Sequence, residues 1–550
     1  MEGSAGMQIS NLLSTNMLDL PLLLLYAETH FRFFRWFPSL LFKKEPEVLF
    51  DLPRRIEPGS NLPVLLIIND IRMYPDSPGQ VAIAVSQKAG NGSTLFTFLS
   101  PDSAEVTHSF KDNQRVCIFE IPEDQIPEGE FFVTATVTMN SGKKSYTVLN
   151  DNLNTSSKRA FRCYKSPYHL PGNELCSYGD LHVHSRYSQS HVEFGPPIGI
   201  IDKMAKCCGL SFAGITDHSY DLSCDRNDYL TENQSLERWK NLSRELSEPE
   251  DFSTILLQGE EVSCLNRNGK TVHLGALGIS NFIPGSSDGA RRNLLFKQSL
   301  TIPEAITSIH RQGGIAFAAH PGSRSGLLQS IFLGRGQWEP ADCEADLDGL
   351  QSFNGSFLAS WKRAKLMWIN MLATGRRVPL LAGNDAHGDF NRYRAVRTPF
   401  LSIYENFQRF MGYGKTGIYG KCTTGEEVLQ KIRSGATFTT TGPYISINYS
   451  DQPADSAVGN HTPHKKRDRL FVHALTTREF GMLRTLSVYS GGSGSREKPV
   501  FSTEIQPDVA EVNIPVSVTG VTAGSYVRAE VTSRDENGEL YQAFSSPCWR

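Results

Sequence analysis

The sequence lacks the cysteine pattern of a disulfide-stabilised protein and a marked charge of either sign. Its ten cysteines are scattered over 550 residues without a CxxC pair. The 55 lysines and arginines nearly balance 58 aspartates and glutamates, which leaves a formal net charge of −3. The cysteine pattern favours a reducing, cytoplasmic compartment. The charge balance provides no extended basic surface for nucleic acid.

The sequence also lacks an apolar run long enough to cross a bilayer, which takes about 20 residues. The apolar stretch from Leu18 to Ala27 is followed at once by Glu28 and by the basic segment "HFRFFRWFPSLLFKK". A secretory signal would have its basic residues before the apolar core instead. We therefore expect residues 1–44 to be an N-terminal extension without a transmembrane segment, packed on the protein as an amphipathic helix rather than anchored at a membrane surface.

Three common nucleotide and nucleophile motifs are missing as well. No GxGxxG follows a predicted strand, no Walker loop is present, and no GxSxG elbow appears. The sequence therefore gives no support for a dinucleotide-dependent hydride transfer, a P-loop or a serine nucleophile of the α/β-hydrolase kind.

The chain is too long for one hydrophobic core, and its residue pattern changes twice. Residues 45–170 read as short strands separated by turn-forming residues, which is typical of a β-sandwich-like domain. Residues 171–445 alternate predicted strands with helices, and residues 446–550 return to a β-type pattern. Repeated strand–helix units imply a parallel sheet, open or closed into a barrel. Neither flanking β domain carries recognisable chemistry.

Histidines gather in the strand–helix region, and most of them stand at the same structural place. The segment "GDLHVHSRYSQSH" holds three, and eight of the fourteen lie between residues 182 and 387. The histidines at the ends of predicted strands are His182, His184, His218, His273, His320 and His387. Two carboxylates, Glu261 and Asp385, stand at further strand ends. Imidazoles and carboxylates converging in this number indicate a transition-metal site with more ligands than one ion can use.

The order of these motifs resembles that of the PHP superfamily, named for polymerase and histidinol phosphatase. The matching motifs run from residue 178 to 390 and are "DLHVHS", "GITDH", "GEEV", His273, "AAHPG" and "GNDAH". The resemblance implies an α/β fold, a distorted (β/α)7 barrel, here flanked by N-terminal and C-terminal β-sandwich-like domains, with a trinuclear site for zinc, manganese or iron. The flanking β regions, "TTGPYISI" and "AFSSPCW" are similar to a multidomain branch of carbaryl-hydrolase-type metallohydrolases.

The resemblance also implies how the ligands are shared. A first ion would be held by His182, His184, Glu261 and Asp385. Glu261 would bridge to a second ion that is completed by His273 and His320. A third ion would be held by His218 and His387 with one more ligand.

That last ligand departs from the family pattern. Family members have Asp seven residues after the first histidine or His eight residues after it, whereas this chain has Gln189 and Ser190 there and His191 one position later. We take His191 as the ligand, because imidazole binds transition metals better than a carboxamide does. The alternative is a site that holds two ions and in which the third position is depleted.

Three neighbouring residues are expected to stay outside the ligand set. Glu260 precedes Glu261 on a predicted strand and therefore faces the other side. Asp217 would likewise face away from the site, or would orient a ligand. His310 lies inside the predicted helix "PEAITSIHRQGG", where a structural role is expected.

Two or three divalent ions close together lower the pKa of a water molecule and hold it as hydroxide, which makes hydrolysis the expected reaction. The residues expected to be catalytic are Glu261, Asp385 and His191. Four arginines beside the motifs favour an anionic substrate, and they are Arg186, Arg324, Arg392 and Arg394.

We therefore expect a phosphoesterase for phosphomonoesters or phosphodiesters, acting on small molecules or oligonucleotides in the manner of a nucleotide phosphatase or an exonuclease. Hydrolysis of a carbamate or a carboxylic ester is the first alternative, and a non-catalytic metal-binding module is the second. Imidazole-rich sites accept zinc, manganese and iron, so the sequence does not select the metal. It also leaves the oligomeric state open.

Overall fold

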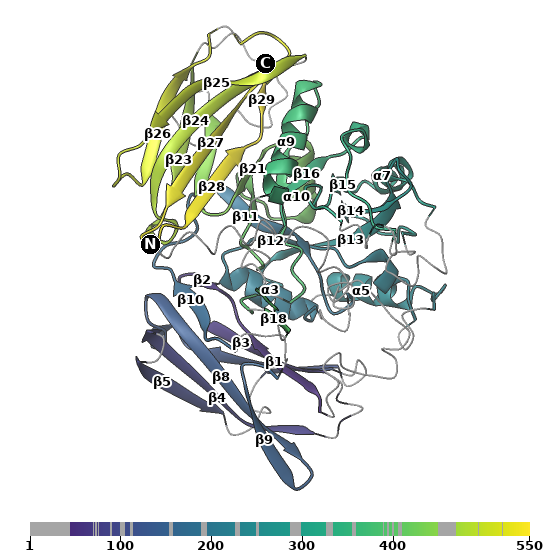
Figure 1. Cartoon of the computed structure of the whole chain (residues 1–550), viewed down its shortest axis with the longest axis vertical. Helices are drawn as coiled ribbons and strands as arrows, with labels where there is room; N and C mark the ends of the chain where they lie inside the picture. Colours follow the sequence, from purple (N-terminus) through teal and green to yellow (C-terminus); the bar gives the residue numbers. More distant parts are fainter. Residues whose placement is uncertain are drawn as a thin grey trace.

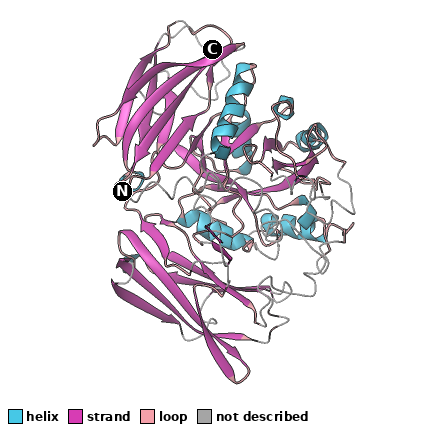
Figure 2. Cartoon of the chain, in the orientation of Figure 1, coloured by secondary structure: helices cyan, strands magenta, loops and turns pink. Residues whose placement is uncertain are grey.

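The structure, a computed structural model, describes the chain in segments separated by gaps. The described residues are 45–69, 71, 74, 76–88, 91–98, 105–109, 114–152, 158–188, 195–225, 231–248, 252–285, 299–325, 330, 334–354, 359–388, 390–392, 395–398, 401–404, 410–448, 469–492, 494–519 and 521–550. The predicted N-terminal extension lies outside them. The N-terminal strands (purple) and the C-terminal strands (yellow) lie at opposite ends of the molecule, with the helices mostly between them (Figures 1 and 2).

Two sheets build the N-terminal part. One has the order β1 (Glu47–Asp51), β3 (Leu62–Asn69), β7 (Gln114–Ile121) and β6 (Glu105–Ser109). The other has the order β2 (Arg55–Ile56), β10 (Phe161–Lys165), β8 (Gly129–Ser141), β4 (Ser77–Lys88) and β5 (Asn91–Phe98), with β9 (Lys144–Leu149) beside β8. Every second residue of β8 from Phe131 to Met139 is buried, so the alternation directs one face of the sheet into the core.

One sheet of fourteen strands runs from the middle of the molecule into the C-terminal part. Its central strands, in spatial order, are β17 (Leu380–Ala382), β16 (Gly349–Phe353), β15 (Ile315–Ala318), β14 (Thr271–Leu277), β13 (Ile255–Leu265), β12 (Phe212–Ile215), β11 (Cys176–Val183), β20 (Lys415–Tyr419) and β21 (Thr437–Thr440). The C-terminal strands that continue it are β28 (Leu540–Ser545), β27 (Ser525–Arg534), β24 (Met482–Gly492) and β25 (Ser495–Glu504), with β29 (Cys548–Trp549) beside β27.

Two small sheets complete the strands. The first consists of β22 (Tyr444–Asn448), β23 (Arg469–Leu475) and β26 (Glu511–Ser517), and β22 contacts β27 and β28 of the large sheet. The second pairs β18 (Ala395–Thr398) with β19 (Leu401–Tyr404).

The prediction of a (β/α)7 barrel is wrong. Strands make up 45% of the described residues and helices 17%, and the strands of the metal motifs belong to the large mixed sheet. A turn joins β13 directly to β14 with no helix between them, and β14 is antiparallel to both of its neighbours. On its other side β11 pairs with antiparallel β20, and β21 pairs with the C-terminal strand β28. A short apolar run predicts a buried strand but says nothing about the direction of the strand beside it, which is why the repeated-unit interpretation failed.

The strand directions nevertheless bring the motifs together. Strands β11, β12 and β13 are parallel, as are β15, β16 and β17, and antiparallel β14 between the two sets gives all six the same direction. The segment after β17 is hydrogen-bonded back to β11, because Asp385 N donates to His182 O at 2.9 Å and His184 N donates to Ala386 O at 2.9 Å. The ends of the first and the last of these strands therefore lie side by side.

Six α-helices occur among the described residues, and they are α3 (Ile198–Cys207), α4 (Ser219–Leu222), α5 (Glu237–Ser247), α7 (Ile302–Arg311), α9 (Ala359–Ala373) and α10 (Gly425–Arg433). Helix α7 shows why its sequence forms one. A capping box of Thr301 and Glu304 satisfies the first backbone N–H groups. The buried residues Ile302, Ala305 and Ile309 follow helical spacing and face the core.

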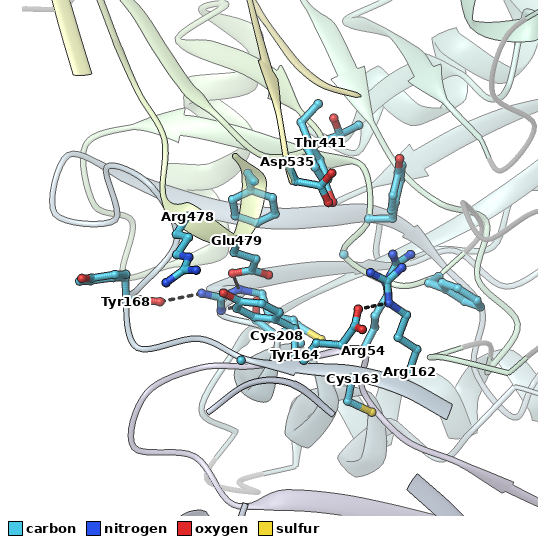
Figure 3. A pocket seen from close by; sticks show the side chains of 18 of the residues that line it. Arg54, Arg162, Cys163, Tyr164, Tyr168, Cys208, Thr441, Arg478, Glu479 and Asp535 are labelled. Carbon is cyan, nitrogen blue, oxygen red and sulfur yellow. Dashed lines mark hydrogen bonds and ion pairs between the residues drawn. The ribbon is translucent and has the colours of Figure 1, made fainter. Parts of the chain in front are cut away.

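The N-terminal, central and C-terminal parts meet around a cavity of about 620 Å³. Its wall contains the start of β2, part of β10, the segment that leads into β20, and the turn after β27 (Figure 3). None of the described candidate metal ligands lines it.

Candidate metal centre

The described part of the predicted ligand set lies together in the central sheet. His182 is the penultimate residue of β11, Glu261 lies within β13, and His273 lies within β14. The other candidates lie one to five residues after the ends of strands β11, β12, β15 and β17, and they are His184, His218, His320, Asp385 and His387. His191 and Gln189 lie outside the described residues.

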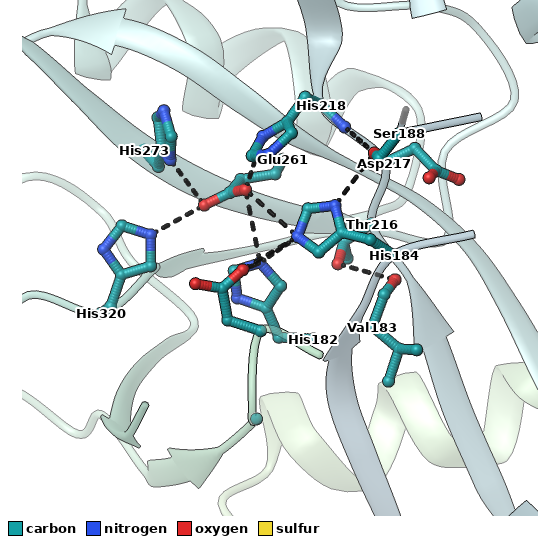
Figure 4. A network of polar contacts seen from close by, with 12 residues as sticks. His182, Val183, His184, Ser188, Thr216, Asp217, His218, Glu261, His273 and His320 are labelled. Atoms are coloured by element: carbon teal, nitrogen blue, oxygen red, sulfur yellow. Dashed lines mark hydrogen bonds and ion pairs between the residues drawn. The ribbon is translucent and has the colours of Figure 1, made fainter. Parts of the chain in front are cut away.

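The first group consists of His182, His184, Glu261 and Asp385, of which Figure 4 labels the first three. The two imidazoles face each other, with 3.1 Å between His182 Nε2 and His184 Nε2. Asp385 Oδ1 lies 3.0 Å from His184 Nε2 and 3.5 Å from His182 Nε2. Glu261 Oε2 lies 3.4 Å from each of these nitrogens. Four potential ligand atoms thus surround one small volume.

Glu261 is the centre of the whole arrangement. Its Oε1 contacts His273 Nδ1 at 2.6 Å and His320 Nε2 at 2.8 Å. Its Oε2 lies 2.8 Å from His218 Nδ1, on the side of the first group. The Glu261 side chain has no exposed surface. One buried carboxylate therefore joins all the neighbouring imidazoles, as a bridging ligand would.

A further group of three imidazoles consists of His184, His218 and His387. The rings of His184 and His387 are stacked with their centroids 3.8 Å apart, and His387 Nε2 lies 3.3 Å from His218 Nε2. The resemblance associates His218 and His387 with a third ion. It assigns His184 to the first ion instead.

The carboxylates are held in their charged form by the histidines. Burial raises the pKa of Glu261, but His273 and His182 outweigh burial and hold that pKa well below its usual value. The pKa of Asp385 is likewise raised by burial and is brought well below its usual value by His182 and by its hydrogen bond with His184. Charged carboxylates are the form that binds metal ions.

The imidazoles differ in the direction of their shifts. Burial, with the neighbouring histidines, lowers the pKa of His184 well below its usual value, and burial lowers the pKa of His320. Burial also lowers the pKa of His182, but Glu261 and Asp385 raise it to about 9. Neutral His184 and His320 have a lone pair available for a metal ion.

Hydrogen bonds behind the ligands fix which ring nitrogen faces the centre. Gln351 Oε1 lies 2.9 Å from His182 Nδ1, and Gln351 Nε2 donates to the carbonyls of Phe353 and Gly383 at 3.1 and 2.9 Å. Because the amide nitrogen is directed at two carbonyls, the amide oxygen accepts from His182 Nδ1–H. His182 Nε2 is then the atom that faces Glu261 and Asp385.

His184 has a support of the same kind. Its Nδ1 lies 3.0 Å from Ser188 Oγ, which also accepts from the backbone N–H of His218 at 3.0 Å. Asp217 accepts from Ser185 N at 2.8 Å and Ser185 Oγ at 2.6 Å. Asp217 therefore stabilises the loop after β11 and lies behind the ligands rather than among them.

Glu260 faces away from Glu261, as expected for neighbours on a strand. Its carboxylate accepts from Ser219 Oγ at 2.7 Å and from Ile283 N at 3.0 Å, and burial raises its pKa to about 8. His310 lies on helix α7, away from the candidate ligands. Its Nε2 is 2.7 Å from Asp348 Oδ2.

Two candidate ligands have an unusual backbone conformation. His320 has a φ of 32° and Asp385 a φ of 55°, in the left-handed region that residues with a Cβ seldom adopt. Such strain is retained where the surrounding structure determines the conformation, and it is concentrated at functional sites.

Two buried potential ligand atoms without hydrogen-bond partners in the described part of the chain indicate that metal ions fit this arrangement. Glu261 Oε2 and His218 Nδ1 are buried and have no hydrogen-bond partner among the described residues, although they are 2.8 Å apart. An ion between such atoms satisfies both, since imidazole nitrogen and carboxylate oxygen are ligands for first-row transition metals. Three groups of potential ligand atoms each lie within 4.8 Å of one another. These buried groups can therefore hold metal ions.

Sequence reasoning missed Arg335, which is buried beside the centre. Arg335 Nη1 lies 2.8 Å from His273 Nε2. The segment around it pairs with β14, since Thr271 N donates to Gly334 O and Gly336 N donates to Thr271 O. The only signal in the sequence is the pair of glycines that flank the arginine in "LGRGQW", and at the second of them, Gly336, a Cβ would collide with Lys270 just before β14.

The four predicted substrate arginines have different surroundings. Arg186 forms an ion pair with Glu245, so its charge is already matched. Arg324 is exposed and Arg392 is buried, while Arg394 lies outside the described residues.

Comparisons with known proteins identify no family for this chain. No family model matches it, and no curated protein matches it. Among solved structures, a proposed beta-galactosidase from Bacteroides fragilis shows 9% identity and a TM-score of 0.19, over 92% of this chain and 74% of that one. A beta-D-mannosidase from Dictyoglomus thermophilum shows 9% identity and a TM-score of 0.16, over 92% and 66% of the two chains. Likenesses this low carry no information about fold or function.

No helix in the described part of the chain is both long and apolar enough to span a membrane.

Proposed function

We propose that this protein is a metal-dependent hydrolase that resembles the PHP superfamily in its ligand motifs. The observation that carries the proposal is the buried carboxylate of Glu261, which lies within 3.4 Å of a nitrogen of each of five histidines: His182, His184, His218, His273 and His320. A purely structural carboxylate needs a few hydrogen bonds rather than a shell of imidazoles.

Three groups of residues would hold the ions, and Glu261 belongs to two of them: His182, His184, Glu261 and Asp385; His218, Glu261 and His273; and His184, His218 and His387. Divalent ions bound there would act as Lewis acids that lower the pKa of water and stabilise negative charge on an oxyanion. The chain contributes the rest. Gln351 and Ser188 orient the imidazoles of His182 and His184, and burial excludes bulk water from Glu261.

We further propose that the substrate is a phosphoester. Arg335 supports this, because its guanidinium is buried within hydrogen-bond distance of a candidate ligand and guanidinium groups suit phosphate oxygens. Arg324 is exposed four residues after His320 and is a second candidate for the same role. Arg186 is a weaker candidate than the sequence suggests, because Glu245 already neutralises it.

The test is a hydrolysis screen of protein loaded separately with zinc, manganese or iron. The substrates are phosphomonoesters, phosphodiesters, short oligonucleotides, aryl carbamates and carboxylic esters. We expect turnover of phosphoesters, competitive inhibition by inorganic phosphate, and an increase in KM in Arg335→Lys. Carbamate turnover without phosphoester turnover would reverse the substrate assignment, and a metal-loaded protein without any turnover would favour a binding module.

A further inference from the structure

The cavity between the three parts of the chain is a second candidate binding site, and it is independent of the proposed function. It has a volume of about 620 Å³, which lies in the range of small-molecule sites. Sites of this kind are frequent where separate parts of a chain meet. Residues from all three parts line it, among them Arg54, Thr441 and Asp535 (Figure 3).

Most charges around the cavity are matched within the protein. Arg55 Nε lies 2.8 Å from Glu479 Oε2, and Arg162 pairs with Glu130. Arg478 Nη2 lies 3.2 Å from Glu536 Oε1, close to solvent. Glu128 and Asp535 also line the cavity, so the five cationic and five anionic side chains of its wall balance.

Lys415 is an exception. It is 3% exposed, and its Nζ donates to the carbonyls of Gly412 and Tyr413 at 3.0 and 3.1 Å. An ammonium group has three donors, so one remains after these two bonds. No carboxylate among the described residues forms an ion pair with Lys415, and burial lowers its pKa to about 8. A buried cation without a carboxylate partner is costly unless something else supplies the negative charge.

Arg54 forms an ion pair with Glu539, whose Oε2 lies 3.7 Å from its Nη2, too far for a hydrogen bond. Its Nη1 is enclosed and has no hydrogen-bond partner among the described residues. The enclosed donors that remain at the cavity therefore belong to two cationic side chains.

The rest of the wall is largely aromatic. Phe480 and Tyr541 pack edge to face with ring centroids 5.3 Å apart, and Lys415 Nζ lies 5.4 Å from the centre of the Phe480 ring. Tyr164 and Tyr413 line the same space. Aromatic walls bind flat apolar groups, while the free donors bind a negative charge.

We propose that this cavity binds a small organic anion, with its acidic group at Lys415 and Arg54 and its apolar body between the aromatic side chains. The volume exceeds what a single inorganic anion fills. A carboxylate and a phosphate offer the same oxygen acceptors to the two cations, and two probes distinguish them.

Titration calorimetry and thermal unfolding of the full chain test this site. The probes are benzoate and phenyl phosphate, with benzyl alcohol as the neutral counterpart and benzamidine as the cationic one. We expect one or both anions to bind and raise the melting temperature, and the neutral and cationic probes to have no effect. Stronger binding of benzoate would assign a carboxylate, and stronger binding of phenyl phosphate would assign a phosphate.

Variants decide whether binding occurs in the cavity, because either anion can also bind a metal ion elsewhere. Lys415→Met and Arg54→Gln should each weaken binding of the anion at least tenfold. Lys165→Met is the matched control, since Lys165 Nζ also donates to two carbonyls, at 2.8 and 3.3 Å, but does not line the cavity. It should bind like the wild type. The proposal is overturned if neither anion binds at 10 mM, if benzyl alcohol binds equally well, or if both cavity variants bind as the wild type does.

Discussion

Two of the buried clusters of charged side chains in the described part of this protein differ in the source of their positive charge. Between α9 and the C-terminal strands, Arg528 makes two hydrogen bonds to Glu497, at 2.7 and 2.5 Å, and also pairs with Glu530. Lys365 of α9 lies 2.5 Å from Glu530. Two cations face two carboxylates, so this cluster is complete within the chain.

The cluster around Glu261 is not complete in this sense. Its two carboxylates are surrounded by imidazoles, whose positive charge depends on protonation, and Glu261 Oε2 and His218 Nδ1 have no hydrogen-bond partner. Burial of charge without a fixed partner is unfavourable, and metal ions are the usual compensation at a site rich in histidine. The comparison teaches that the first cluster is neutralised by groups of the chain itself, while the second consists of groups that can hold metal ions.

Replacing a candidate metal ligand should have the largest effect, and it should act on the cluster around Glu261 alone. Asp385→Ala and His184→Ala each remove an atom from the first group, so we expect both metal content and hydrolysis to fall to a few per cent of the wild type or less. Loss of a supporting residue alone costs about 10- to 100-fold, and loss of a ligand should cost more. Elemental analysis and turnover measurements check this.

The control for these variants is His310→Ala, because His310 pairs with Asp348 outside the cluster. It should keep its full metal content. If the ligand variants also keep theirs, the buried cluster is not a metal site.

The predicted number of ions rests on His191 and Gln189, which lie outside the described residues. We expect His191→Ala to lose about one ion per chain and most of the turnover, because imidazole completes a transition-metal site better than an amide does. Gln189→Ala should have only a mild effect. The opposite ranking would make Gln189 the ligand, and two small effects would indicate a centre of two ions.

Breaking the complete cluster should affect stability and not metal binding. Arg528 is 1% exposed, so Arg528→Met leaves Glu497 and Glu530 without their main partner. We expect the free energy of unfolding to fall by about 3–5 kcal/mol, as for other buried pairs that lose one member. Denaturant unfolding measures the change, and elemental analysis should show an unchanged metal content.

Arg478→Met provides the comparison, since Arg478 forms an ion pair with Glu536 and the two side chains are 73% and 81% exposed. A pair exposed to this extent contributes about 0–1 kcal/mol. If the two variants lose similar stability, the buried cluster has no special structural role.

Removing metal ions from the cluster around Glu261 should lower the stability of the protein. Ions that bind only the folded chain stabilise it by about 2.7 kcal/mol at a free concentration one hundred times the dissociation constant. We expect a chelator to lower the melting temperature of the wild type and of Arg528→Met by similar amounts, because distant sites act additively. A chelator without effect on either protein would argue against bound ions.

The sequence predicted the members of the cluster better than the architecture that brings them together. His182, Glu261 and Asp385 could be found because imidazoles and carboxylates at the ends of predicted strands are unusual. Strand direction could not be found, since an apolar run such as that of β14 looks the same in a parallel and an antiparallel sheet. The barrel prediction failed for this reason.

The supporting residues were also beyond the reach of the sequence. Gln351 lies on β16, between motifs and without a pattern of its own, and Arg335 lies in a segment that only pairing with β14 brings to His273. Their roles depend on contacts between residues far apart in the chain. Such contacts have no local signature.

The smallest predicted effect is that of replacing Gln351. It tests whether this residue orients the His182 ring or is itself needed to form the metal site. Gln351 Oε1 accepts from His182 Nδ1–H and from the backbone N–H of His320, at 2.9 and 3.2 Å, so it holds the ring that turns Nε2 toward the centre. Gln351→Leu removes this acceptor but no ligand. We expect metal affinity to fall about 10- to 100-fold while the maximum number of bound ions stays the same. Gln351→Glu keeps an acceptor for His182 and should retain more affinity than Gln351→Leu in a competition titration with a coloured chelator. A lower number of bound ions at saturation would show instead that Gln351 itself is needed to form the site, and equal affinity of Gln351→Leu and wild type would show that the orientation of His182 does not depend on it.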